Sequence, residues 1–156
     1  MHGCLRQGAM AEPIDILLVE DNPNDVQLTL LAFQRQNLSN KIAVVRDGEE
    51  ALAFIFCTGA FAQREGAPLP RLILLDLKLP KIDGLDVLRR LKAEERTRRT
   101  PVVMLTSSRE RTDVQQAYAI GANSYIVKPV EFDKFLDVTR QLGVYWLLFN
   151  EPAHAA

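Results

Sequence analysis

Five short apolar runs, each followed by a segment with the pattern of a helix, constrain the fold of this chain more than any other feature. The runs are residues 14–20, 41–46, 71–77, 101–107 and 124–128. They are continuously apolar rather than alternating, which is typical of strands in a parallel sheet that helices cover on both faces. With right-handed crossovers between parallel strands, the pattern predicts an α/β fold: a (βα)5 three-layer sandwich around a five-stranded parallel sheet.

Helix signals occupy the segments that follow the runs. A helix is expected over residues 25–36 with Asn24 as its N-cap, and another over residues 47–56 with Asp47 as its cap. Further helices are expected over residues 83–94, 112–121 and 131–149. The last of these is either one long helix or a helix followed by an arm.

Composition and charge argue against several classes of function. The chain has 156 residues and a net charge of −1, so it has the size of one domain and no basic field for nucleic acid or an anionic membrane. No apolar run is long enough to span a membrane, and the N-terminus lacks the apolar middle of a signal peptide. We therefore expect a cytoplasmic protein with a disordered leader (residues 1–12), one domain (13–142) and a C-terminal extension (143–156).

Cys4 and Cys57 have neither a disulfide-framework nor a metal-binding spacing, and Cys57 is expected in or near the core.

Carboxylates follow two of the apolar runs. Glu20 ends the first run and Asp21 follows it directly, and Asp76 lies near the end of the third. Because the carboxyl ends of parallel strands meet at one edge, these side chains are expected to crowd one pocket if the two strands are neighbours. Uncompensated carboxylates would repel one another, and a hydrated site of oxygen ligands favours Mg²⁺, with Mn²⁺ as the second choice. The alternative is that each acid only caps the helix that follows it.

Two more polar side chains end other runs at the same edge. Thr106 lies near the end of the fourth run and Lys128 ends the fifth. A hydroxyl and an ammonium beside a magnesium ion are suited to bind a phosphoryl group, and a carboxylate can accept that group as an acyl phosphate. Each residue alone also has an ordinary interpretation, Thr106 as a helix cap and Lys128 as a surface lysine.

The ordered motifs resemble the receiver domain of two-component response regulators. The matching stretches are "VEDN", "LLDLKLP" followed by "DG", "LTSS" and "YIVKP", in family order over residues 14–140. The resemblance implies a flavodoxin-like fold with strand order 2-1-3-4-5. It also implies a signalling protein that catalyses only its own phosphorylation and dephosphorylation and is otherwise not an enzyme.

The resemblance assigns roles to the acidic residues. Asp76 is expected to be the phosphoacceptor, and Asp21 and Asp76 are expected to bind Mg²⁺ through their side chains. Lys78 would bind the metal through its backbone carbonyl, and Glu20 would act through water.

The resemblance also implies a conformational switch. Thr106 and Lys128 would bind the phosphoryl group, and the Tyr125 ring would turn inward when Thr106 moves. The Lys128–Pro129 peptide is expected to be cis. A Tyr125 that simply packs in the core is the alternative.

Two departures from the family pattern bear on the metal site and on the partner. Many relatives have two aspartates where this chain has Glu20–Asp21, a change that leaves the metal expectation in place. Residues 57–70 contain two glycines and two prolines and are expected to form a loop, longer than in minimal receivers. This loop and the C-terminal "YWLLFNEP" resemble the stand-alone regulators paired with bacterial phytochrome kinases. The expected partners are therefore a sensor histidine kinase, such as a bacteriophytochrome, acting in trans, and an unidentified downstream protein.

Three alternatives stay open. Residues 145–149 form an apolar patch that either makes a homodimer contact or packs back on the domain. A phosphohydrolase with an aspartyl nucleophile would carry a second acid two residues later, where this chain has Lys78. A receiver-like scaffold that takes no phosphate is disfavoured because the acids, Thr106 and Lys128 are all present.

Overall fold

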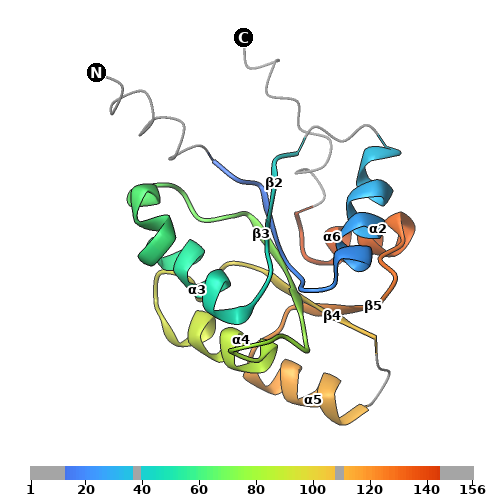
Figure 1. Ribbon diagram of the computed structural model, residues 1–156. Coiled ribbons are helices and arrows are strands. Elements are labelled where there is room, and N and C mark those ends of the chain that lie inside the picture. The colour runs from blue at the N-terminus through green and yellow to red at the C-terminus, as the bar shows by residue number, and fades with distance from the viewer. Residues whose placement is uncertain (1–12, 37–39, 108–110, 145–156) are drawn as a thin grey trace.

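The strands and helices alternate along the chain as the sequence predicts. The computed structural model describes residues 13–36, 40–107 and 111–144. Within them, the elements are β1 (Ile16–Val19), α2 (Pro23–Gln34), β2 (Ile42–Val45), α3 (Gly48–Phe56), the 3₁₀ helix η1 (Gly59–Arg64), β3 (Leu72–Asp76), α4 (Gly84–Ala93), β4 (Val102–Thr106), α5 (Arg111–Ile120), β5 (Ser124–Val127) and α6 (Phe132–Gln141). All four strand pairings are parallel, in the order β2-β1-β3-β4-β5, so the predicted fold and strand order are confirmed (Figure 1).

Helices cover both faces of the sheet, which explains the continuously apolar strands. Helices α3, α4 and α5 lie on one face, and α2 and α6 lie on the other (Figure 1). Alternate residues of a strand point to opposite faces, so Leu17 packs in the cluster beneath α3 and α4 while Leu18 packs beneath α2 and α6. The central strand β3 is buried along its whole length.

Helix α2 begins earlier than the sequence analysis predicts. Asn22, not Asn24, is its N-cap: the Asn22 side chain accepts hydrogen bonds from the backbone N–H groups of Asn24 and Asp25 at 2.8 and 3.2 Å. Pro23 occupies the first helical position, where its missing N–H has no consequence. The cap predicted for α3 is confirmed, since the Asp47 side chain accepts from the N–H of Glu50 at 2.7 Å.

The segment predicted as a loop over residues 57–70 contains a helical turn. The 3₁₀ helix η1 ends at Arg64, whose guanidinium lies 4.0 Å from the centre of the Phe54 ring, a cation–π contact that the glycine and proline content does not reveal. Cys57 is half-buried, as expected for a position near the core, and its left-handed conformation ends α3.

The last helix is the shorter of the two predicted forms. Helix α6 ends at Gln141, and Gly143 follows with a φ of 75°, a conformation that stops an α-helix. The predicted leader over residues 1–12 and the apolar patch over residues 145–149 lie outside the described residues. Among the described residues, no helix has the length and apolar character of a membrane span.

Candidate functional site

The pairing of β1 with β3 brings the predicted acids together. The register sets Val19 beside Leu75, so the residues that follow them, Glu20 and Asp76, emerge side by side at the carboxyl edge. Glu20 is 1% exposed and Asp76 is 4% exposed, while Asp21 faces solvent. One oxygen from each of these three carboxylates lies within 4.8 Å of the others. The sequence prediction that the acids share one pocket therefore agrees with the structure.

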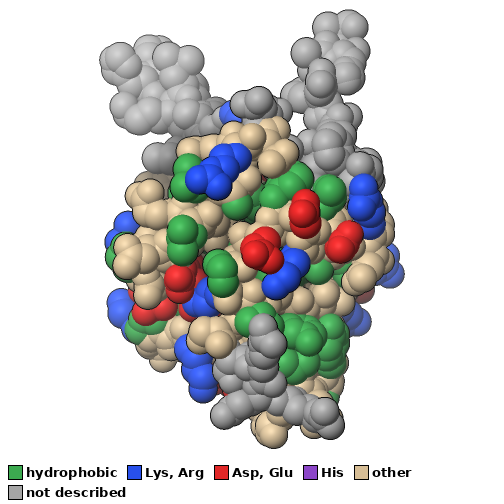
Figure 2. Space-filling model, turned by 90° about the vertical axis from the view of Figure 1, so that its right-hand side faces the viewer, with side chains coloured by type: hydrophobic (Ala, Val, Ile, Leu, Met, Phe, Trp, Pro, Cys, Tyr) green, Lys and Arg blue, Asp and Glu red, His purple; other side chains and the backbone are tan. Residues whose placement is uncertain are grey.

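Lys128, at the end of β5, places its ammonium among these acids. Its Nζ lies 3.0 Å from Glu20 Oε1, 3.2 Å from Asp76 Oδ2 and 2.9 Å from Asp25 Oδ2. Figure 2 shows one face of the molecule, on which acidic and basic side chains are intermixed with hydrophobic ones. Lys128 is thus no ordinary surface lysine, because its side chain is only 11% exposed and pairs with three carboxylates.

Asp25 was missed in the sequence analysis. It lies in the first turn of α2, which starts at the same edge of the sheet, and it joins the site through Lys128. The signal that could have identified it is the third acid of "EDNPND", which follows the first two closely enough to remain near the strand end.

Backbone N–H groups fix the orientation of the two buried carboxylates. The N–H of Asn22 donates to Glu20 Oε2 at 3.1 Å, and the N–H of Lys78 donates to Asp76 Oδ1 at 3.2 Å. Each carboxylate therefore has one oxygen bound to the backbone and the other bound to Lys128. This arrangement preorganises the site before any ligand arrives.

Burial and crowding alter the proton affinities in the pocket. Desolvation, reinforced by the hydrogen bond and charge of Asp76, raises the pKa of Glu20 to about 7, although Lys128 opposes the shift. Desolvation alone would lower the pKa of Lys128, but its hydrogen bonds to Asp25 and Glu20 and the charge of Asp76 hold that pKa above its ordinary value. The ammonium therefore stays charged at neutral pH while Glu20 titrates there.

The remaining predicted residues belong to β4 and β5: Thr106 ends β4, and Tyr125 is the second residue of β5. Thr106 is 3% exposed, and its carbonyl accepts a hydrogen bond from the N–H of Lys128 at 2.8 Å. The Lys128–Pro129 peptide is cis, as expected. Tyr125 is 39% exposed and packs edge-on against Tyr118 with ring centres 6.0 Å apart, so the alternative of a core Tyr125 is wrong.

The donor set of the pocket fits a hard divalent cation. Carboxylate oxygens are the ligands that Mg²⁺ and Mn²⁺ prefer, and the exposed position of Asp21 leaves one side open to water. Burial, and to a lesser extent Asp76, raises the pKa of Glu20, so a cation in the pocket would favour the ionised form of this carboxylate.

Comparison with known proteins identifies the family. Residues 16–140 match the response regulator receiver domain. This chain belongs to the response regulator receiver family. Response regulator Rcp1 of Synechocystis is 36% identical over 135 residues, covering 86% of this chain and 90% of Rcp1. The probable methanogenesis regulatory protein FilR2 of Methanothrix harundinacea is 40% identical over 139 residues, covering 89% of this chain and 87% of FilR2.

Solved structures of phytochrome response regulators are similar to this chain. The bacteriophytochrome response regulator AtBRR is 51% identical, with a TM-score of 0.80 and coverage of 90% of this receiver domain's chain and 99% of its own. The Mn²⁺-bound form of Rcp1 is 34% identical, with a TM-score of 0.70 and coverage of 89% and 97%. The predicted likeness to phytochrome response regulators is therefore confirmed.

Proposed function

We propose that this receiver domain accepts a phosphoryl group on Asp76 from a sensor histidine kinase in a Mg²⁺-dependent reaction. The observation that carries the proposal is the position of Asp76: its carboxylate is buried, oriented by the Lys78 N–H and 3.2 Å from the Lys128 ammonium. One oxygen of this carboxylate therefore lies beside the Lys128 ammonium, which can stay paired with the phosphoryl group as that group is transferred.

Each residue of the pocket has its own proposed role in the transfer. Asp21 and Asp76 would hold the metal through their side chains, Lys78 through its carbonyl and Glu20 through water, and the ion would neutralise charge on the phosphoryl oxygens. A carboxylate oxygen of Asp76 forms the new bond to phosphorus as the bond between phosphorus and the kinase histidine nitrogen breaks, and the imidazole leaves. Lys128 pairs with a phosphoryl oxygen as the acyl phosphate forms.

The signal would be a change at the neighbouring strand ends. The Thr106 hydroxyl would donate to a phosphoryl oxygen, and the Tyr125 ring, now exposed against Tyr118, would turn inward into the space that Thr106 leaves. Another protein would then bind the altered β4–β5 surface, or the phosphoryl group would pass from Asp76 to another protein in a phosphorelay.

A surface beside the pocket suits the kinase. Leu28 and Leu31 of α2 are 50% and 43% exposed, and they line a shallow cavity together with Pro129 and Val130, which follow Lys128 directly. A kinase that delivers phosphorus to Asp76 has to contact the protein around this edge, and exposed apolar residues there favour a protein partner. We propose a bacteriophytochrome kinase in the cytoplasm, by the likeness to AtBRR.

Incubation with acetyl phosphate and Mg²⁺, followed by intact-mass measurement, tests the proposal. We expect one added phosphoryl group that decays slowly and that Asp76→Asn does not acquire. No adduct on the folded wild type would favour the scaffold alternative, and rapid turnover of simple phosphoesters would favour a phosphohydrolase.

The C-terminal residues carry a separate proposal, a homodimer formed through residues 145–149. Light scattering at several concentrations, with Trp146→Ala beside the wild type, tests it. A wild-type mass that stays monomeric at every concentration would exclude the dimer.

A further inference from the structure

The N-terminus of α3 packs against the loop that follows the acceptor strand. This β3–α4 loop comprises residues 77–83. Gly48 is the first residue of α3, and its N–H, which has no acceptor within the helix, donates to the carbonyl of Pro80 at 3.3 Å. A Cβ atom at position 48 would overlap the backbone carbonyl of Ile82, so only glycine allows the helix to approach this closely.

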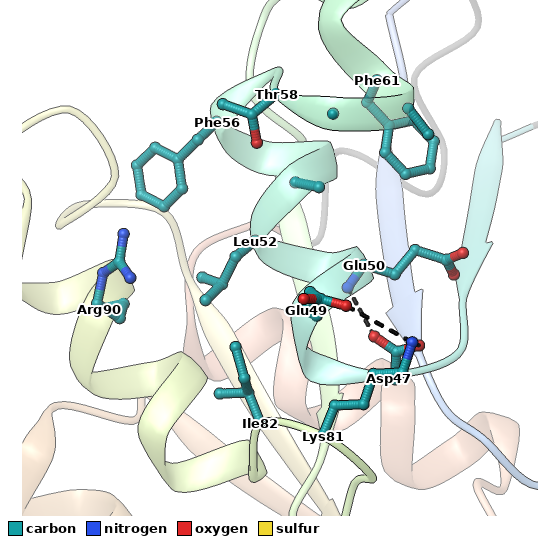
Figure 3. Close-up of a pocket in the computed structure, with 13 residues that line it drawn as sticks. Asp47, Glu49, Glu50, Leu52, Phe56, Thr58, Phe61, Lys81, Ile82 and Arg90 are labelled. Atoms are coloured by element: carbon teal, nitrogen blue, oxygen red, sulfur yellow. Dashed lines mark hydrogen bonds and ion pairs between the residues drawn. The ribbon is translucent and has the colours of Figure 1, made fainter.

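The loop has a conformation that needs support from outside. Lys81 has a φ of 68°, unusual for a residue with a side chain, and the N–H of Ile82 donates to the carbonyl of Pro80 at 2.8 Å across it. Strained turns of this kind persist where the surroundings fix them. The Lys81 ammonium also lies 3.7 Å from Asp47 and 3.5 Å from Glu49 in the first turn of α3 (Figure 3). The Lys81 side chain is largely exposed, so these ion pairs are weak and the Gly48 contact is the stronger support.

The other part of the loop belongs to the acidic pocket. The N–H of Lys78 donates to Asp76 Oδ1, and the N–H of Gly84 donates to the carbonyl of Leu77 at 3.2 Å. Only Leu79 separates Lys78 from Pro80, which accepts the hydrogen bond from Gly48. A displacement of Pro80 is therefore transmitted to Lys78 within two peptide units.

We propose that Gly48 is a positioning residue for the metal and phosphoryl chemistry of Asp76. By allowing α3 to close on the β3–α4 loop, it holds the Lys78 backbone where its N–H orients Asp76 and its carbonyl can bind the cation. The inference rests on the proposed function and adds to it a residue that has no contact with the pocket. Mg²⁺ requires near-ideal ligand geometry, so a small displacement of one ligand weakens its binding.

Open space borders the contact between Gly48 and the loop. A cavity with a volume of about 570 Å³ lies along α3, lined by Leu52, Phe56 and the side chains of Lys81 and Ile82 (Figure 3). A methyl group added to Gly48 overlaps the backbone of Ile82 rather than a flexible side chain, so the loop itself has to shift.

The test is Gly48→Ala, with Gly121→Ala as the matched control. The Gly121 substitution, directly after α5, adds a methyl group 3.1 Å from Lys92 Cγ and forces a residue with a side chain to a φ of 129°, so it strains the fold away from the pocket. We expect Gly48→Ala to weaken Mg²⁺ binding, measured by calorimetry, by about tenfold and to slow acetyl phosphate labelling at saturating Mg²⁺ by at least about tenfold. Gly121→Ala is expected to lower only the thermal midpoint.

The wild type and two further variants separate the possible outcomes. If the wild type binds Mg²⁺ and is labelled on Asp76, while folded Gly48→Ala matches it in both, the positioning role is refuted and the proposed function stands. If the folded wild type neither binds Mg²⁺ nor becomes labelled, the proposed function fails first. Should Gly48→Ala not fold, Lys81→Gly decides: glycine adopts the same φ but frees the loop, so we expect about threefold weaker Mg²⁺ binding. Unchanged Mg²⁺ affinity in Lys81→Gly would overturn the inference. Asp21→Asn removes a proposed metal ligand, and its loss of Mg²⁺ affinity is the reference for the other variants.

Discussion

Magnesium binding to this receiver domain should be coupled to proton release near neutral pH. Glu20 has a pKa of about 7 because burial and the neighbouring Asp76 disfavour its charged form. A cation binds the ionised cluster best, so it must displace the proton that Glu20 carries below that pKa. With this pKa, about nine-tenths of Glu20 is protonated at pH 6 and about one-tenth at pH 8.

The magnitude follows from these fractions. We expect the apparent affinity for Mg²⁺ to be about tenfold weaker at pH 6 than at pH 8, with about 0.9 protons released per ion at pH 6 and about 0.1 at pH 8. Isothermal titration calorimetry in two buffers with different ionisation enthalpies measures both quantities. Glu20→Gln keeps one oxygen, which can accept from the Asn22 N–H or from Lys128, and it cannot titrate, so it should remove most of the pH dependence. Glu65→Gln, an exposed acid outside the pocket, is the control and should behave as the wild type.

The raised pKa of Glu20 also makes the stability of the folded protein depend on pH. An acid whose pKa is raised in the folded state favours folding below its unfolded pKa and loses that contribution as the pH rises through the folded value. The metal-free protein should therefore lose on the order of 3 kcal/mol of stability from this group between pH 4.5 and pH 8, and Glu20→Gln should not. Equal Mg²⁺ affinity at pH 6 and pH 8, with no difference in proton release, would refute the reasoning.

The remaining predictions concern charge and packing. Lys128→Met should lower the free energy of unfolding at pH 8 by about 3–5 kcal/mol, because it leaves buried carboxylates without a cation; a smaller loss is expected at pH 6, and urea denaturation at both pH values measures it. Asp25→Asn should change the Mg²⁺ affinity by less than about threefold, because Asp25 lies outside the metal-binding cluster, and a calorimetric loss as large as that of Asp21→Asn would contradict this assignment. Phe135→Ala should lower the free energy of unfolding by about 3–5 kcal/mol in the same urea assay, because the ring is fully buried against Phe33; an unchanged midpoint would show that the ring packs differently.

The sheet and the centre of the site could be predicted because burial leaves a simple trace in the sequence. A strand covered on both faces must be apolar along its length, as residues 72–75 are, and the first polar residue then marks its carboxyl end. Asp76 occupies such a position and Lys128 follows the last residue of β5, so the parallel topology brings both to the same edge of the sheet.

The features that were missed depend on how helices and loops approach the edge. Asp25 reaches Lys128 only because α2 starts at Pro23 with Asn22 as its cap, a choice between neighbouring asparagines that local propensity does not make. The outward position of Tyr125 depends on Tyr118, a residue of another element. The Gly48 contact joins segments more than thirty residues apart, and nothing in either segment alone indicates the distance between them.

The alternation of strand and helix has a practical consequence for handling this protein. Helix α6 starts after the carboxyl end of β5 and runs back along the sheet, so its last residue, Gln141, lies toward the edge where β1 begins at Ile16. Both ends of the folded body therefore leave it on the side away from Asp76. A fluorescent reporter or a chip linkage attached beside Ile16 or beside Gln141 would therefore leave the acceptor face open to a kinase.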